Sequence, residues 1–587
     1  MAAHEMSAPA PTLSAPEAMV RVRMAMERGD LAGARAVVEE ARRAHPRDAA
    51  LADAAGDIAL KSGDAPAAAA HFAAACALAP AMMDYALNHA IALQRLERHA
   101  EALAAIAPHE KAGRGVARYG SVAALSHRAL GQPGEAARWY EAALAAEPRH
   151  PRALHGRARV ALERGEGDAL ARFDAALAVN PGDADLWLGK AQALEVAGDV
   201  TGARAIAEQV CAQAPGFIAA LTFLAGLKHA AGEADWTSPF AEAAQKHPQD
   251  PNIPAAHAEA FAGLDHAAEA AEVAADARRR FPGEPHFALI EAVHRGSAGQ
   301  WEEAEAIFAQ LSDTRAMRHL HEARHALRAR DLSRAHACLD RALAANPWDI
   351  SAWALRGIAW RLGEDEASRA KAEWLHEQAG LVALRELVGR VGLVADAVAE
   401  LRAIHARSTM PLGQSLRGGT QTRGILFHRT EPVLAELHEA IRATLEVHRE
   451  GLPPLDESHP LLRHRETPWR LLGSWSVRLA GGGAPGSGDY HTAHIHPQGI
   501  LSSALYLVVP EEAHAPVAEG ELPQGWLEIG RPPPDLGLDL PPLRTIEPKE
   551  GHLALFPSTL YHGTTPFGSA ERMTVAFDVV TGDGVTA

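Results

Sequence analysis

The chain has 587 residues, of which 48% are hydrophobic but only 5% aromatic, and its formal net charge is −17. Such an acidic chain is poorly suited to bind the phosphate backbone of a nucleic acid. Its apolar share is largely alanine, which favours helices in close contact. The three scattered cysteines (Cys76, Cys211 and Cys338) exclude a disulfide framework and a thiolate metal site, and they indicate a reducing compartment.

Residues 1–14 have alanine, proline and serine character without the basic segment and apolar run of a signal peptide, and we expect them to be disordered. Nowhere does the sequence contain the long uncharged apolar stretch that a membrane-spanning helix needs. The sequence therefore predicts a cytoplasmic protein without a membrane partner.

The prolines that end helix-like runs recur at a nearly constant interval. Most neighbours lie about 34 residues apart and the others about twice as far, a period typical of stacked helix pairs. Most are preceded at a fixed distance by an alanine, as Pro215 is by Ala203, and several by an earlier glycine, such as Gly198. Small residues let two helices approach, glycine closes the first helix and proline ends the second. The prolines are Pro46, Pro80, Pro148, Pro181, Pro215, Pro248, Pro282 and Pro347.

This pattern resembles the tetratricopeptide repeat over residues 15–375, and Trp187, Ala203 and Pro215 match that family within one unit. The resemblance implies an N-terminal α-solenoid with an extended concave groove. Such a groove is expected to bind a protein or peptide partner. The alternative is a spacer or a dimerisation scaffold.

The texture of the sequence changes after the repeats. Residues 376–409 keep a helical pattern and predict connecting helices, whereas residues 410–587 are rich in glycine and proline. Short apolar runs there, such as SSALYLVV and RMTVAFDVV, predict strands, with one helix near residues 431–448. We therefore expect a multidomain α plus β protein whose C-terminal domain is a double-stranded β-helix, or jelly roll.

The densest group of chemically active side chains is YHTAHIHP at residues 490–497. On a strand, His494 and His496 point to one face with Cα atoms roughly 6.5 Å apart, so they can converge on a metal ion. His562 closes a later strand, and a jelly roll can bring distant strand ends to one mouth. The alternative is a histidine-rich loop that binds no metal.

Strand alternation in the segment that begins at Arg572 places Arg572, Thr574 and Ala576 on one face. An arginine facing a cavity is costly unless it meets an anion, and its planar fork suits a carboxylate. A metal with a carboxylate-binding arginine nearby is what a 2-oxoglutarate site requires.

The HxHP and FPSxLxH motifs, followed by arginine ten residues later, resemble the 2-oxoglutarate/Fe(II)-dependent oxygenases that are fused to tetratricopeptide repeats. The layout is also similar to that of aspartyl/asparaginyl β-hydroxylases. The resemblance implies that His494 and His562 bind Fe(II) and that Arg572 binds the distal carboxylate of 2-oxoglutarate. It also implies hydrogen bonds to this cosubstrate from Tyr506 and Thr574.

One position departs from that family, because His496 stands where the usual triad has a carboxylate. We favour a set of three histidines, which would keep the full +2 charge on Fe(II) and would also suit zinc, nickel or copper. In the alternative, two histidines and a water bind the metal while His496 lies behind them. Asp489 could substitute, but its odd spacing from His494 puts it on the wrong strand face.

The predicted function is that of a non-haem Fe(II)/2-oxoglutarate-dependent dioxygenase, a hydroxylase whose repeats bind a partner or substrate. One alternative is an interaction scaffold with a non-catalytic jelly roll. Another is a cupin-like three-histidine metalloenzyme that does not use 2-oxoglutarate.

Two further segments each have two possible roles. LRGGTQTRG (residues 416–424) lines the substrate mouth or is a solvated turn, and RPPPDLGLDLPPLR (residues 531–544) is a loop or a lid.

Overall fold

The computed structural model describes residues 13–311, 316–408, 416–479, 490–517, 522–568 and 571–582. Residues 1–12, most of the segment predicted to be disordered, lie outside the described residues. Asp489 lies outside them as well. Two compact units make up the chain, residues 1–189 and 190–587, and the division falls within helix α12 (Ala184–Val196).

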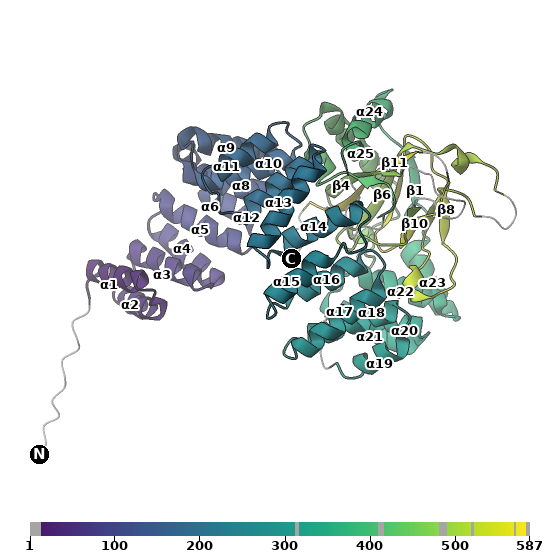
Figure 1. Ribbon diagram of the computed structural model, residues 1–587, viewed down its shortest axis with the longest axis horizontal. Coiled ribbons are helices and arrows are strands. Elements are labelled where there is room, and N and C mark those ends of the chain that lie inside the picture. Colours follow the sequence, from purple (N-terminus) through teal and green to yellow (C-terminus); the bar gives the residue numbers. More distant parts are fainter. Residues whose placement is uncertain are drawn as a thin grey trace, which may run out of the picture. The chain divides into compact units, whose positions relative to one another are not determined.

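The first unit consists of paired helices in the described part of the chain (Figure 1). In several pairs an aspartate caps the second helix: Asp30 accepts from the backbone N of Gly33 at 2.8 Å, and Asp64 from that of Ala67 at 3.0 Å. The helices are α1 (Ala15–Glu27), α2 (Leu31–Ala44), α3 (Ala49–Lys61), α4 (Ala65–Leu78), α5 (Met83–Arg95), α6 (His99–Ile106), α7 (Glu110–Gly113), α8 (Ala117–Ala129), α9 (Pro133–Ala146), α10 (Pro151–Glu163) and α11 (Ala169–Leu177).

Large side chains at the repeat positions fill the space between neighbouring helix pairs. Tyr140 of α9 is 2% exposed, and a Cβ added at Gly156 of α10 would lie 2.1 Å from its ring. Phe173 of α11 lies in the same way against Gly189 of α12, at 2.3 Å. Close packing of this kind leaves no room for larger residues at these glycines.

The second unit contains the remaining repeat helices and the β domain (Figure 1). Its repeat helices are α13 (Val200–Gln213), α14 (Ile218–Ala230), α15 (Ser238–Lys246), α16 (Asn252–Ala262), α17 (Ala267–Arg280), α18 (His286–Ser297), α19 (Trp301–Phe308), α20 (Ala316–Arg328), α21 (Leu332–Ala345), α22 (Ile350–Leu362) and α23 (Glu366–His376). The β domain adds α24 (Leu393–His405) and α25 (Pro432–Glu450).

The strands form antiparallel sheets of six, three and two strands. The six-stranded sheet has the order β1-β9-β6-β11-β4-β3, the three-stranded sheet β10-β7-β8, and the third pairs β2 with β5. The strands are β1 (Ala383–Glu386), β2 (Leu416–Arg417), β3 (Thr420–Gln421), β4 (Trp469–Leu479), β5 (Tyr490–His491), β6 (Leu501–Val508), β7 (Leu527–Ile529), β8 (Arg544–Ile546), β9 (His552–Pro557), β10 (His562–Thr564) and β11 (Arg572–Thr581).

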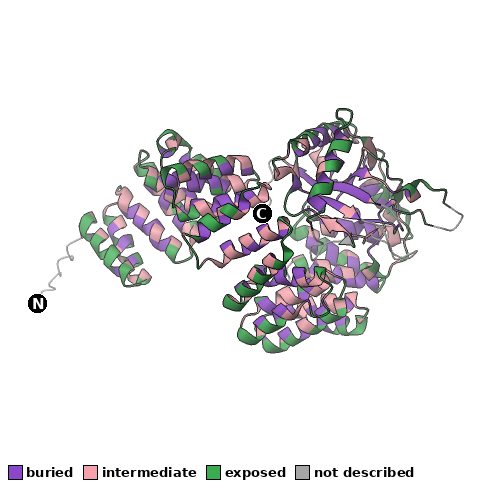
Figure 2. Cartoon of the chain, turned by 45° about the horizontal axis from the view of Figure 1, so that its top comes forward, coloured by how far each residue is buried: buried purple, intermediate pink, exposed green. Residues whose placement is uncertain are grey.

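The two faces of the six-stranded sheet have different neighbours. Odd-numbered residues of β11, from Met573 to Val579, pack with α24 and α25 in one apolar core. On the opposite face, Tyr506 of β6 and Phe556 of β9 pack with Leu527 and Ile529 of β7, in the smaller sheet. Figure 2 shows the strands as largely buried. The predicted alternation along β11 is therefore correct, and it turns Arg572 and Thr574 toward the space between the sheets.

The α plus β class with an N-terminal repeat solenoid is confirmed, whereas the jelly-roll topology stays a prediction. The prediction of connecting helices throughout residues 376–409 is wrong at Ala383–Glu386, because these residues form β1 and pair with β9. Their sequence, ALRE, has good helix formers, but pairing at the sheet edge overrides local propensity. Among the described residues, no helix has the length and apolar character needed to cross a membrane.

Candidate metal centre

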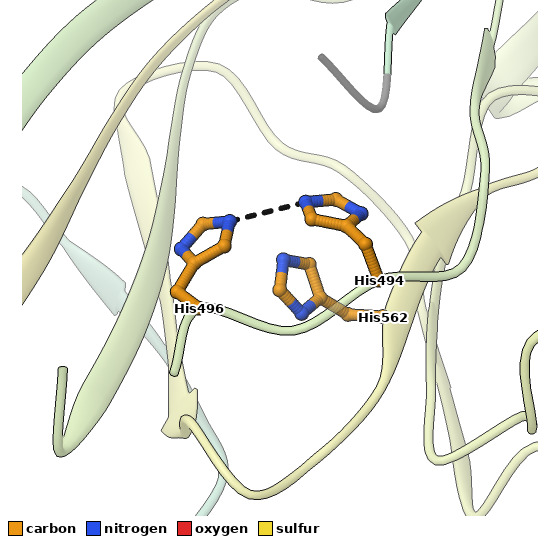
Figure 3. Close-up of side chains that lie close together, drawn as sticks. All are labelled: His494, His496 and His562. Atoms are coloured by element: carbon orange, nitrogen blue, oxygen red, sulfur yellow. Dashed lines mark hydrogen bonds between the residues drawn. The ribbon is translucent and has the colours of Figure 1, made fainter. Parts of the chain in front are cut away.

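The side chains of His494, His496 and His562 lie close together (Figure 3). The backbones of His494 and His562 exchange two hydrogen bonds, N to O, of 3.0 and 2.9 Å. The ring centroids of His494 and His562 are 4.3 Å apart, and that of His496 lies 5.0 and 4.9 Å from them. His494 lies in an isolated bridge instead of the predicted strand, but the expected convergence of the three rings is present.

Each of the three rings has an oxygen acceptor at Nδ1. His494 Nδ1 donates to the carbonyl of Thr492 at 2.8 Å, and His562 Nδ1 to that of Leu560 at 3.3 Å. His496 Nδ1 donates to Oδ1 of Asp578 at 2.5 Å. A carbonyl or carboxylate oxygen accepts only, so these contacts place the ring hydrogen on Nδ1 and leave Nε2 as the ligand atom. Outer partners of this type orient metal-binding histidines.

The Nε2 atoms have the spacing of ligands to a single ion. The ligand atoms of the three histidines all lie within 4.8 Å of one another, and Nε2 of His494 is 3.1 Å from Nε2 of His496 (Figure 3). Two nitrogens bound at about 2.1 Å and at right angles lie about 3 Å apart. With hydrogen on both Nδ1 atoms, two nitrogen lone pairs face each other unless a proton or a cation lies between them.

The protonation state of His562 also suits a ligand. His562 is 7% exposed. Burial, reinforced by the charges of His494 and His496, holds the pKa of His562 well below its usual range. The ring is therefore neutral near pH 7, which is the form that binds a metal.

Arg572 and Tyr506 form a polar pair beside the histidines. Arg572 is 3% exposed, and its Cζ lies 5.6 Å from the centroid of the Tyr506 ring. Neither Nε of Arg572 nor the hydroxyl of Tyr506 has a hydrogen-bond partner among the described residues. Burial lowers the pKa of Arg572 and raises that of Tyr506 to about 12. Buried donors without an acceptor are costly, so this pair suits an anion that enters the cavity.

One cavity of about 390 Å³ connects these groups. The three histidines, Arg572 and Thr574 line it, whereas Tyr506 is not among its lining residues. Gln421, from the segment LRGGTQTRG, lines it as well, in agreement with the first of the two roles considered for that segment. The C-terminal end of α16 and the turn after it contribute Ala262, Gly263 and Asp265, so the repeats supply part of the wall.

Sequence reasoning missed two parts of this site. Asp578 follows Arg572, Thr574 and Ala576 on the same face of β11, so strand alternation could have indicated it as a partner of a histidine. The turn at residues 262–265 has no comparable signal, because its place in the wall depends on tertiary packing.

The fold and the site together define a class of protein: a helical-repeat protein with an antiparallel β domain and a three-histidine cavity. Residues 473–578 match the family model described as "Putative 2OG-Fe(II) oxygenase". Residues 20–83, 122–169 and 167–216 match the model of the tetratricopeptide repeat. Both resemblances seen in the sequence are thus confirmed at the level of the domain family.

Solved structures similar to this chain are tetratricopeptide repeat proteins. One from Parabacteroides merdae ATCC 43184 is 19% identical, with 41% of this chain and 96% of that chain covered and a TM-score of 0.36. A thermophilic one from Thermus thermophilus is 23% identical; the match covers 30% of this chain and 98% of that chain, with a TM-score of 0.27. No curated protein matches the chain.

Proposed function

We propose that this protein is a non-haem Fe(II)/2-oxoglutarate-dependent dioxygenase that hydroxylates its substrate. The observation that carries the proposal is one cavity with two kinds of prepared site. Three Nε2 atoms converge at ligand spacing, and a buried arginine with an unsatisfied Nε lies beside them. The match of residues 473–578 to the oxygenase family supports the same assignment.

The donor set fits Fe(II). Neutral imidazole is a suitable ligand for iron, and His494, His496 and His562 would hold the ion on one side and leave positions open on the other. The carboxylate missing from position 496 is present behind the ring of His496, as Asp578. Its negative charge offsets part of the metal charge through the imidazole, so the site is less cationic than three histidines alone suggest.

The cosubstrate fits the other half of the cavity. Arg572 would pair with the distal carboxylate of 2-oxoglutarate and Thr574 would donate a hydrogen bond to it, whereas Tyr506, which is outside the cavity lining, would support Arg572. Fe(II) bound together with 2-oxoglutarate would supply the oxidising chemistry with O₂ as the oxidant, in which one oxygen atom enters succinate as 2-oxoglutarate loses CO₂ and the other hydroxylates a substrate C–H bond. The chain's own residues hold the reactants in register, keep His562 neutral and exclude water.

Two alternatives make different predictions. A scaffold with a non-catalytic β domain would bind no stoichiometric metal, whereas a cupin-like enzyme would bind metal without 2-oxoglutarate. One experiment separates the oxygenase, the scaffold and the cupin-like enzyme. The protein is loaded with Fe(II) without oxygen and titrated with 2-oxoglutarate, and succinate is measured after oxygen is admitted. Stoichiometric iron, saturable 2-oxoglutarate binding and succinate release are expected. Absence of both binding and succinate would exclude the oxygenase.

The repeats also have a proposed role in binding a protein or peptide partner. Within residues 190–587, several repeat side chains already contact the β domain; for example, Arg361 of α22 donates to the carbonyl of Pro541 at 2.6 Å. We therefore assign partner binding to the repeats of residues 15–189. Arg118 of α8 is 40% exposed and pairs with Asp84 of α5 at 3.2 Å. Affinity capture with the full chain should be weakened by Arg118→Glu, and capture that this variant leaves unchanged would count against the assignment. A cytoplasmic location stays a prediction, motivated by the absence of disulfides among the three cysteines.

A further inference from the structure

The residues adjacent to the histidine ligands pack into the repeats. Tyr561 directly precedes His562 and is 6% exposed, and Ile495 lies between His494 and His496. The side chain of Tyr561 belongs to the apolar cluster of the last repeats, which we name the α20–α22 core, and the partly buried side chain of Ile495 packs against it. This core is formed by buried residues of α20, α21 and α22, including Ala323, Leu327, Leu339, Leu355 and Ile358.

A polar network reinforces the contact at Tyr561. Arg324 of α20 donates from Nη1 to the Tyr561 hydroxyl at 3.0 Å and from Nε to Asp535 at 2.9 Å. Arg328, one turn further along α20, donates from Nη2 to Asp535 at 2.5 Å and from Nε to its backbone carbonyl at 2.8 Å. The side chain of Arg328 is 2% exposed, so this pairing is shielded from solvent. It fixes the segment RPPPDLGLDLPPLR, considered as a loop or a lid, against the repeats.

The backbone of Tyr561 is held from the other side. Its carbonyl accepts from N of Gly530 at 2.6 Å, and the Gly530 carbonyl accepts from Arg361 of α22. The peptide that leads into His562 is therefore fixed by its side chain, by its carbonyl and by the pairing of β10 with β7. A ligand held in this way has little freedom to leave its position.

We infer that the α20–α22 core is part of the metal centre, with Tyr561 and Ile495 as positioning residues for the three histidines. The inference rests on the proposed function, since it takes His494, His496 and His562 as metal ligands. Ligands must be held to about 0.5 Å, which requires supporting residues whose own side chains are locked by packing. Here the support comes from helices that end at Leu362, far ahead of the oxygenase match at residues 473–578.

The test compares Mn²⁺ binding by the full chain and by variants with anaerobic calorimetry, together with the visible spectrum of the Co²⁺ form. Tyr561→Phe removes only the hydroxyl that Arg324 contacts, and Arg324→Gln removes the guanidinium. Each is expected to weaken Mn²⁺ binding about tenfold, as the loss of outer partners of a metal ligand commonly does. Because both changes break one network, the double variant should lose less Mn²⁺ binding free energy than the sum of the losses in the two single variants. Ile495→Ala should weaken binding at least as much and change the Co²⁺ spectrum.

Two matched controls separate positioning from stability. Tyr119→Phe removes a buried hydroxyl that donates to the carbonyl of Ile106 at 3.1 Å, and Ile58→Ala opens a buried space in the first unit. Both should lower the free energy of unfolding and leave the Mn²⁺ dissociation constant unchanged.

The outcomes are distinguishable. Wild-type protein that binds Mn²⁺, with an unchanged dissociation constant in Tyr561→Phe and Ile495→Ala, would overturn this inference and leave the proposed function intact. Wild-type protein that binds no divalent metal would overturn both. If Ile495→Ala does not fold, Tyr561→Phe, which keeps the shape of the side chain, decides the question.

Discussion

Asp578 on β11 and His496 in the histidine segment are joined by a hydrogen bond of 2.5 Å between Oδ1 and Nδ1. Both side chains are only 12% exposed, so solvent screens this pair weakly. The contact orients the ring of His496 and places a negative charge directly behind a candidate metal ligand. The metal-binding properties of the site should therefore depend on a residue that does not touch the metal.

Replacement of Asp578 tests this dependence. Asp578→Asn keeps an acceptor for Nδ1 but removes the charge, and we expect it to weaken Mn²⁺ binding about tenfold. Asp578→Ala removes both the acceptor and the charge, and it should weaken Mn²⁺ binding further. Calorimetric dissociation constants for the two variants and the wild type give the comparison. Equal affinity in all three would mean that the carboxylate has no part in metal binding.

His496→Ala decides between three and two histidine ligands. If His496 is a ligand, its removal should abolish stoichiometric Mn²⁺ binding, as removal of His562 should. If only His494 and His562 bind the ion, His496→Ala should retain stoichiometric metal. His514→Ala, at an exposed position, is the control for loss of a histidine as such.

Arg572 should affect 2-oxoglutarate and not the metal. Hydrogen bonds to charged groups contribute about 1.5–3 kcal/mol, so Arg572→Met should weaken 2-oxoglutarate binding about tenfold to a hundredfold. The Mn²⁺ dissociation constant should stay within about twofold, since Arg572 is not a ligand.

Arg478→Met is the matched control, because Arg478 on the neighbouring strand β4 pairs with Glu571 at 2.7 Å. Equal 2-oxoglutarate affinity in the two variants would show that Arg572 does not bind the cosubstrate.

Stability should fall as the pH is lowered through the range of buried histidines. Burial lowers the pKa of His376 to about 3 and those of His405 and His448 to about 4. In the unfolded chain these side chains titrate near pH 6.5, so the unfolded state binds more protons below that pH. The free energy of unfolding should therefore decrease from pH 6.5 toward pH 4, by up to about 1.4 kcal/mol per histidine for each pH unit.

His448 offers a direct check of that effect. It is fully buried in α25, and neither ring nitrogen has a hydrogen-bond partner among the described residues. His448→Leu should flatten the pH dependence of urea unfolding between pH 5 and 7 relative to the wild type. An unchanged slope in His448→Leu would show that this ring is not neutral in the folded state.

Local patterns in the sequence were sufficient for the repeats and for much of the site. The proline period predicted the helix pairs, and alternation along β11 placed Arg572 and Thr574 in the cavity. The same alternation continues to Asp578. Local propensity failed at β1, where pairing with β9 decides the conformation. The contributions of Asp265 and Tyr561 depend on contacts between distant segments, which no local pattern in one sequence reveals.

The pairing of β1 with β9 also determines where this protein can be divided. A fragment that began at residue 410 would lack β1 and leave the outer edge of β9 with unpaired backbone groups. Open edges of this kind recruit strands from other molecules and promote aggregation. A fragment with the whole six-stranded sheet must start before Ala383, and even then it would expose the surface that the α20–α22 core covers. We therefore expect the oxygenase-type domain to be soluble only together with the repeats that precede it.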